Sequence, residues 1–216
     1  PRLHGDRVTY DRPDSDDDPR GWPDPHHIFL IYLTQNASQK WLARHMYAPV
    51  GADYKATAAQ LFDLAKANDQ TTPYRVGDNL VGLVWRRPCY LCLVLDSDGA
   101  EFIDVDVVDE PSFDPIQFYA KKAVLGTNPV SYNEYDPNHS FYNCDVDTVR
   151  GRSAFYCINY LKDELGNDLK YPKVRSYGFH IVYKAIWING EVRPHTIDPD
   201  GQNQGPPSLV SQLEYV

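Results

Sequence analysis

Two short acidic stretches carry oxygen ligands in the alternation that calcium loops use. Asp96-Ser-Asp98-Gly and Asp198-Pro-Asp200-Gly each place two carboxylates beside a glycine. An EF-hand loop adds a bidentate glutamate at its last position, and both stretches lack one. Asp-x-Asp-Gly is also ordinary turn chemistry, which is the interpretation we favour. The sequence therefore predicts turns at Asp96/Asp98 and Asp198/Asp200, with calcium as the one cofactor to test there.

The four cysteines include one pair at the spacing of redox motifs and zinc knuckles. Cys89 and Cys92 are three residues apart within an apolar run, whereas Cys144 and Cys157 are separated by thirteen positions. Residues three apart in a strand point to opposite faces, so Cys89 and Cys92 cannot act together there. The second pair also lacks knuckle spacing. We expect buried thiols or an incidental disulfide.

No sequence motif in the chain indicates a particular catalysed reaction. The seven histidines are scattered, and His195 lies near Asp198 and Asp200 in the sequence, which allows an acid–base pair or a metal site. The alternative for a strand histidine is a structural hydrogen bond. Nucleophile elbows, phosphate-binding glycine loops and H-E-x-x-H are absent from the sequence. The sequence therefore favours a protein that is not an enzyme.

Aromatic side chains between Asn and Asp residues form the remaining candidate site. Large rigid rings beside hydrogen-bonding groups suit sugar faces and protein interfaces. The alternative is a segment that folds back and buries them. The candidate ligand-binding residues are Tyr119, Tyr132, Tyr135, Phe141 and Tyr142.

Composition limits the partners of the chain. With a net charge of −9 over 216 residues, it lacks the clustered cations that a nucleic-acid backbone requires. No apolar run approaches the roughly 20 residues of a membrane-spanning helix, and the N-terminus lacks a signal-peptide pattern. Because the chain begins at Pro1, processing upstream stays open, and so does export. An extracellular or surface location is favoured if the protein assembles, and a cytoplasmic one otherwise.

Apolar periodicity predicts several strands and one helix. Tyr54, Ala58, Leu61, Phe62 and Ala65 form one stripe, which predicts a helix over 52–68 with Asp53 as its N-cap. Residues 41–47 fit either a strand or a helical turn. The run 27–34 predicts a central strand that is buried on both faces. Further strands are expected at 80–85, 90–95, 101–108 and 154–161.

The tail from Phe179 to Pro207 predicts a hairpin closed by a two-residue turn at Asn189-Gly190. Residues 109–147 show no sustained period, so they predict a long irregular loop. Residues 1–27 contain seven Asp, four Arg and five Pro, which predicts an extended acidic arm. The chain would then comprise this arm, one domain over 28–207 and a tail over 208–216.

A family resemblance follows from three segments. They are the run from His27 through Tyr-Ala-Pro-Val-Gly-Ala-Asp, the stretch Tyr74-Arg-Val-Gly-Asp-Asn79, and the late Thr-Ile-Asp-Pro-Asp-Gly-Gln-Asn-Gln-Gly-Pro-Pro. Together they resemble a group of small bacterial proteins and, more distantly, the inclusion-body or AidA/PixA-like β-sandwich family. The resemblance covers about half of the chain and implies a β-sandwich that self-associates. It implies no catalytic residues, and the 109–147 segment departs from the family pattern.

The sequence thus predicts an all-β, mainly antiparallel sandwich with one packed helix. The expected function is a non-enzymatic structural protein that binds copies of itself, with the arm covering a sheet edge of the next subunit. The alternative is a lectin-like module that binds glycans, with or without calcium.

Overall fold

The computed structural model describes most of the predicted domain. The backbone is described for residues 22–37, 41–67, 83–102, 116–120, 130–131, 141–162, 167–169, 174–186, 192–197 and 200–204. Side chains are described for residues 22–37, 41–67, 85–102, 141–142, 145–162 and 167–169. The predicted strand at 101–108 is therefore described only as far as Phe102.

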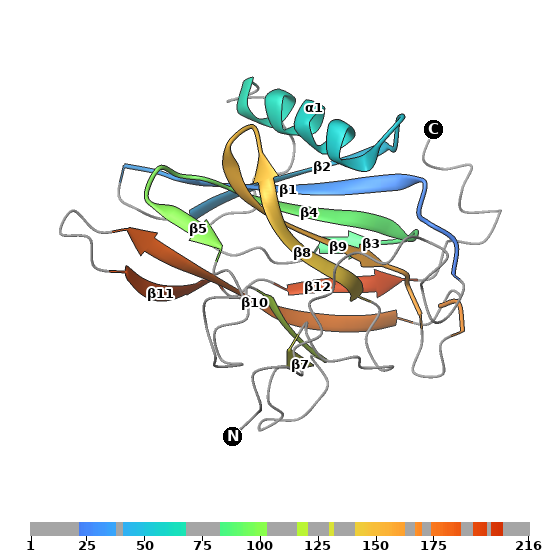
Figure 1. Cartoon of the computed structure of the whole chain (residues 1–216). Helices are drawn as coiled ribbons and strands as arrows, with labels where there is room; N and C mark the ends of the chain where they lie inside the picture. Colours follow the sequence, from blue (N-terminus) through green and yellow to red (C-terminus); the bar gives the residue numbers. More distant parts are fainter. Residues whose placement is uncertain are drawn as a thin grey trace, which may run out of the picture.

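The described chain is mainly β, with two mixed sheets and one helix. The first sheet has the strand order β2-β1-β4-β9-β8. Its strands are β1 (His27–Gln35), β2 (Trp41–Pro49), β4 (Cys89–Asp96), β8 (Phe141–Val149) and β9 (Arg152–Asn159). Figure 1 shows the helix α1 (Tyr54–Ala67) above this sheet and the second sheet on its other side.

The second sheet has the order β3-β12-β10-β6-β7, and β5 and β11 also pair with β10. Its strands are β3 (Leu83–Trp85), β5 (Ala100–Phe102), β6 (Ile116–Ala120), β7 (Val130–Ser131), β10 (Val174–Ile186), β11 (Val192–Ile197) and β12 (Asp200–Gln204). Two described strand pairs, β1 with β4 and β12 with β3, are parallel and the other pairs are antiparallel. The mainly antiparallel arrangement is confirmed.

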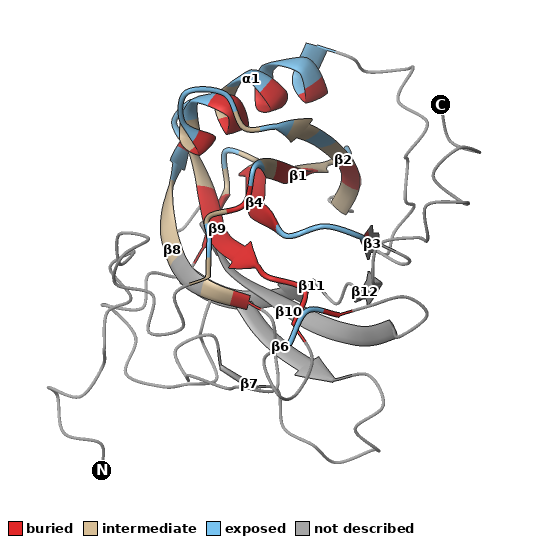
Figure 2. Ribbon diagram, turned by 90° about the vertical axis from the view of Figure 1, so that its right-hand side faces the viewer, coloured by how far each residue is buried: buried red, intermediate tan, exposed pale blue. Residues whose placement is uncertain are grey.

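The strand predicted from the run 27–34 lies inside the first sheet and is buried on both faces, as expected. Its odd and even positions enter two different core clusters. Phe29, Ile31 and Leu33 join the cluster on the side away from the helix. Ile28, Leu30 and Tyr32 join the cluster under the helix. The same alternation continues through β4 and β9, which are buried along nearly their whole length (Figure 2).

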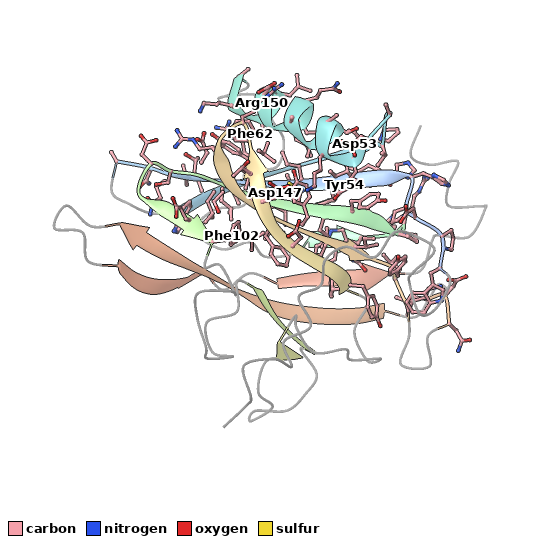
Figure 3. The ribbon with its side chains drawn as sticks, in the orientation of Figure 1. Asp53, Tyr54, Phe62, Phe102, Asp147 and Arg150 are labelled. Carbon is pink, nitrogen blue, oxygen red and sulfur yellow. The ribbon has the colours of Figure 1, made fainter. Side chains whose placement is uncertain are left out.

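The predicted helix forms with the predicted cap. The Asp53 carboxylate accepts a hydrogen bond from the Ala56 amide at 2.9 Å, which satisfies one of the free amides of the first turn. The whole predicted stripe is buried, together with Thr57. Tyr54 stacks on Tyr90 of β4 at a centroid distance of 4.4 Å. In Figure 3, Tyr54 and Phe62 point from α1 toward the sheet.

Several sequence predictions need correction in the described part. The segment 109–147, predicted as irregular, contains β6, β7 and most of β8. These strands are short or bulged and carry polar residues, so no period of two is visible in the sequence. Residues 41–47, left undecided between strand and helical turn, belong to β2.

The tail hairpin is confirmed as the antiparallel pair of β10 and β11, with Ile186 opposite Val192. A two-residue turn at Asn189-Gly190 would place Ile186 opposite Arg193 instead. The register is thus shifted by one residue from the prediction, and residues 187–191 lie outside the described residues.

The domain packing begins inside the predicted arm. Trp22 contacts the rings of Tyr142 and Tyr160 at centroid distances of 5.6 and 5.1 Å. The His26 carbonyl accepts a hydrogen bond from the Val50 amide at 2.8 Å, and Pro25 is buried. Residues 22–27 therefore pack with the domain, and residues 1–21 lie outside the described residues.

A buried arginine fixes the last turn of the helix. Arg44 of β2 is 6% exposed, and its Nη1 donates to the Ala65 carbonyl oxygen at 2.7 Å. Carbonyls of a last helical turn have no partner within the helix, so this bond joins the helix end to the sheet edge. The guanidinium also lies 5.9 Å from the centroid of the Tyr32 ring.

Replacing Arg44 should therefore destabilise the fold. We expect Arg44→Met, which keeps an apolar stem, to lower the free energy of unfolding by about 2 kcal/mol, since a hydrogen bond from a charged donor is lost at a buried carbonyl. Urea unfolding followed by circular dichroism measures the change. Arg150→Met is the control, because Arg150 makes its ion pair with Asp63 in exposed positions and should change stability little. Equal effects of the two substitutions would contradict this role for Arg44.

Candidate functional site

The two edges of the first sheet differ in how they are protected. β2 forms one edge and pairs with β1 in nine consecutive positions, from Trp41 opposite Gln35 to Pro49 opposite His27. Within the described residues, β2 has no strand on its other side. Edge strands are commonly guarded by bulges, lysines or inward charges. β2 has an unbroken register and no lysine or acidic residue. Its one charged residue, Arg44, points inward and is already bonded to the Ala65 carbonyl of the helix, and its one proline, Pro49, is the last residue of the strand.

The opposite edge, β8, carries such guards. Its register against β9 shifts between Tyr142 and Asp145, which marks a bulge. Asp145 and Asp147 lie toward the helix and form ion pairs with Lys55. Burial is the largest single effect on Lys55 and lowers its pKa, but the hydrogen bond to Asp147 and the nearby negative charges together outweigh it and raise the pKa of the lysine. A further strand is therefore accommodated more readily at β2 than at β8.

Aromatic and imidazole rings form a row on the face of β1 and β2 away from the helix. The rings of His27 and Tyr47 stack at 5.0 Å with an interplanar angle of 6°. Phe29 stacks on His45 at 5.1 Å and meets Trp85 edge to face at 5.9 Å. Tyr47 is 46% exposed, so the row runs from the core to the surface at this edge.

Both histidines of the row are shifted toward the neutral form. Burial lowers the pKa of His45. Burial also lowers the pKa of His27, and Arg87 and His26 add to the effect by charge repulsion. At neutral pH the row is therefore uncharged and suited to contact with another apolar or aromatic segment.

Charged side chains form a cluster around Asp96 at the other end of the sheet. The Asp96 side chain is 8% exposed and accepts a hydrogen bond from the Tyr32 hydroxyl at 2.5 Å. Lys66 of the helix lies 3.2 Å from one carboxylate oxygen, and Arg152 Nε lies 2.8 Å from the other. Burial and the Asp96 carboxylate raise the pKa of Tyr32, which stays protonated. The cluster joins β1, β4, β9 and the helix through one hydrogen bond and two ion pairs.

A polar hollow of about 430 Å³ lies beside this cluster, between the β4–β5 and β8–β9 turns. Asp98 and Asp147 line it, and both carboxylates are paired with cations, Asp98 with Arg152 and Asp147 with Lys55. Phe102 lies at its apolar side. Because its charges are satisfied within the protein, the hollow itself does not indicate a ligand.

The predicted calcium residues are not assembled into a cation site in the described part of the chain. Asp96 is turned inward to Tyr32, Lys66 and Arg152, whereas the Asp98 side chain is 92% exposed. Asp200 is the first residue of β12, with its side chain not described, and Asp198 lies outside the described residues. Among the described residues, no group of three or more His, Cys, Asp or Glu side chains could hold a metal.

The predicted aromatic site is not assembled as expected either. Phe141 is 1% exposed and belongs to the core, where it contacts Trp85, which agrees with the alternative of a buried segment and not with a ligand-binding surface at this residue. Tyr142 is half-buried against Trp22 and Tyr160. Tyr119 lies in β6, with its side chain not described, and both Tyr132 and Tyr135 lie outside the described residues. The described side chains therefore do not form an exposed binding surface from these five aromatic residues.

The prediction for the cysteine pair is confirmed. Cys89 and Cys92 are free, buried and on opposite faces of β4, in different core clusters. Cys157 is also free and buried. Burial raises the pKa of the Cys89 and Cys92 thiols, which makes the reactive thiolate unfavourable.

Sequence analysis missed the residues that organise both ends of the sheet. Arg44, Tyr32 and Arg152 carry no motif, and their partners are distant in the sequence. Only the β2 edge could have been recognised from the sequence, because its run of nine residues contains no lysine or acidic side chain.

Comparison with known proteins gives one distant structural match. No protein-family model and no curated protein matches the chain. The crystal structure of the inclusion body protein PixA from Burkholderia cenocepacia J2315 is similar, with a TM-score of 0.34 and 7% sequence identity over 85% of this chain and 96% of that one. The resemblance noted in the sequence is therefore shared by the structure, as a distant match. At this similarity it carries no inference about binding or assembly.

None of the described helices has the length and hydropathy that crossing a membrane would require.

Removing the charge of Asp96 should weaken the fold with or without calcium. Asp96→Asn leaves Lys66 and Arg152 without their shared anion, so we expect a loss of about 2–3 kcal/mol in unfolding free energy. Thermal and urea unfolding with EDTA and with added calcium measure it. The control is Asp98→Asn at the exposed neighbour, which should have no measurable effect. Calcium stabilisation of the unmodified protein that disappears in Asp96→Asn would contradict this assignment.

The histidine row should make stability fall in mild acid. The pKa of His45 lies below its usual value of 6.5 in the folded protein, so the unfolded chain binds the proton more readily. Stability is then fully present above pH 6.5 and decreases as the pH falls below it. We expect His45→Phe, which keeps a ring on Phe29, to reduce the loss of stability between pH 7 and pH 5. Urea unfolding at a series of pH values measures the slope, and an unchanged slope would count against His45.

Proposed function

We propose that this protein is a non-enzymatic structural protein that assembles with copies of itself through the exposed edge of β2. The observation that carries the proposal is the contrast between the two edges of the first sheet. β2 offers nine residues in unbroken register without a guarding charge, whereas β8 is bulged and acidic. An extended segment from another copy can satisfy the free backbone groups of such an edge.

The partner segment in this proposal is the N-terminal arm of the next subunit. Trp22, the first described residue, packs on the rings of Tyr142 and Tyr160. The point of attachment and the accepting edge are then different surfaces of one subunit. Contacts of this head-to-tail type propagate into rings or filaments.

We also infer that the two sheets form a β-sandwich. Trp85 of β3 and Phe102 of β5 belong to the second sheet by pairing, and both are buried in the core cluster of the first sheet. Phe102 packs on Phe155 of β9 at a centroid distance of 6.0 Å. Such packing would bury one face of the first sheet and leave its edge strand as the accessible backbone surface.

A single charge on β2 should test the proposal. Leu42 is half-buried and lies outside both core clusters, so Leu42→Lys introduces an edge guard without removing core packing. We expect it to raise the concentration needed for assembly at least about tenfold, since a charge confined beside an incoming strand costs more than about 1.4 kcal/mol. Light scattering of the full-length protein over a concentration series measures the mass distribution.

The matched control is Leu64→Lys, at a leucine on the helix that is 55% exposed. It makes the same chemical change away from the edge and should leave assembly intact. Deletion of residues 1–21, which retains Trp22, should reduce assembly as Leu42→Lys does, while circular dichroism shows a folded domain. A full-length protein that stays monomeric at all concentrations would refute the proposal, as would normal assembly of Leu42→Lys.

A further inference from the structure

A basic corner lies where β2 ends beside the start of β1. We define it by Arg87, His26 and the stacked rings of His27 and Tyr47. Arg87 and His26 are exposed, and Tyr47 is 46% exposed. Pro49 of β2 pairs with His27, so the corner lies at the end of the same edge.

The corner is electropositive. Arg87 is three residues before Tyr90, which pairs with Ile28, so it lies close to the start of β1. In agreement with that position, it contributes to lowering the pKa of His27 and opposes the rise in the pKa of Tyr47 that burial causes. His26 adds a second repulsive effect on His27. No carboxylate of the described residues contributes to either shift, and the Arg87 side chain forms no hydrogen bond or ion pair with them. An exposed guanidinium that has no carboxylate partner among the described residues is suited to bind a carboxylate of another segment.

The chain itself contains a complementary segment. Asp14-Ser-Asp-Asp-Asp18 places four carboxylates within five residues, and residues 1–21 as a whole contain six Asp and four Arg. In a chain with a net charge of −9, an electropositive corner at a sheet edge attracts acidic segments against the overall repulsion.

We propose that the basic corner binds the acidic segment Asp14–Asp18 of a second copy of this chain. The inference rests on the assembly proposed above and names the contact that sets the position of the arm on β2. A guanidinium binds a carboxylate through two parallel hydrogen bonds, which fixes orientation as well as adding attraction. The stacked rings beside it supply a rigid apolar surface for the peptide that carries the carboxylates.

The arrangement of the faces favours a second copy over the segment of the same chain. The chain enters the domain at Trp22, which packs into the cluster under the helix. Tyr47 pairs with Phe29, and His27 lies two residues before Phe29 on β1, so both rings share the face of Phe29, away from the helix. Trp22 is four residues after Asp18 and four residues before His26, so a contact within one chain would require a tight reversal of the chain close to Trp22, whereas a second copy can approach the exposed corner directly.

The test compares full-length variants by light scattering over a concentration series. We expect Arg87→Gln to raise the concentration for half-assembly about fivefold, the effect of a charge pair at a partly exposed interface. Arg150→Gln is the control, because it removes the same charge at the far turn of the sheet. Raising the ionic strength from about 0.1 to 1 M shortens the screening length to about 3 Å and should weaken the unmodified protein more than Arg87→Gln.

A charge exchange separates this contact from general effects of charge. Arg87→Glu should weaken assembly further, and adding Asp16→Arg and Asp17→Arg in the same chain should restore it. If Arg87→Glu assembles normally while Leu42→Lys does not, binding at the basic corner is refuted, and the proposed assembly through the β2 edge is supported. If the unmodified protein never assembles, the proposed function fails first. A loss in Arg87→Glu that the exchange does not restore would overturn the pairing with Asp14–Asp18.

Discussion

Burial of one sheet on both faces is the constraint on which the described structure depends. Because side chains alternate along a strand, β1, β4 and β9 need apolar residues at nearly every position, and their partners must cover two surfaces at once. The helix covers one surface, and residues from β3 and β5 contribute to the other. A strand slip of one residue would exchange the two clusters entirely, so the register is held strongly. The strongly held register of β1 presents β2 as a continuous edge.

The helix is held over the sheet by polar contacts at its two ends as well as by its apolar stripe. At its start, Lys55 pairs with Asp147 of β8, and at its end Lys66 pairs with Asp96 of β4. Arg44 adds a bond from β2 to the last turn. The helix is therefore tied to both edges of the sheet and to its centre. The same residues determine the charge at each edge of the sheet. Asp147 adds a negative charge to the β8 edge, whereas the positive charge of Arg44 lies under the helix and away from the β2 edge.

Sequence reasoning succeeded where a single segment contains its own signal. The strand 27–34, the capped helix at Asp53 and the opposite faces of Cys89 and Cys92 all follow from local periodicity. It failed where pairing over long distances decides the structure. β6 to β8 are held by partners elsewhere in the chain, and the hairpin register differs from its turn signal. The sequence favoured a turn at Asp96 and left calcium as an alternative, and it did not reveal the cationic neighbours Lys66 and Arg152, which come from 30 residues before and 56 residues after Asp96.

The unequal edges have a consequence for any assembly that uses them. If both edges accepted strands, copies could join in either direction and the product would lack a defined order. The bulge and acidic pairs of β8 disfavour one of the two choices, so the proposed assembly through β2 would grow with a single polarity. In that proposal the arm of each copy would link it to one neighbour, and its own β2 would accept the arm of another. The charge pattern of the arm would then set its position along the edge, which backbone pairing alone leaves free to slip by two residues.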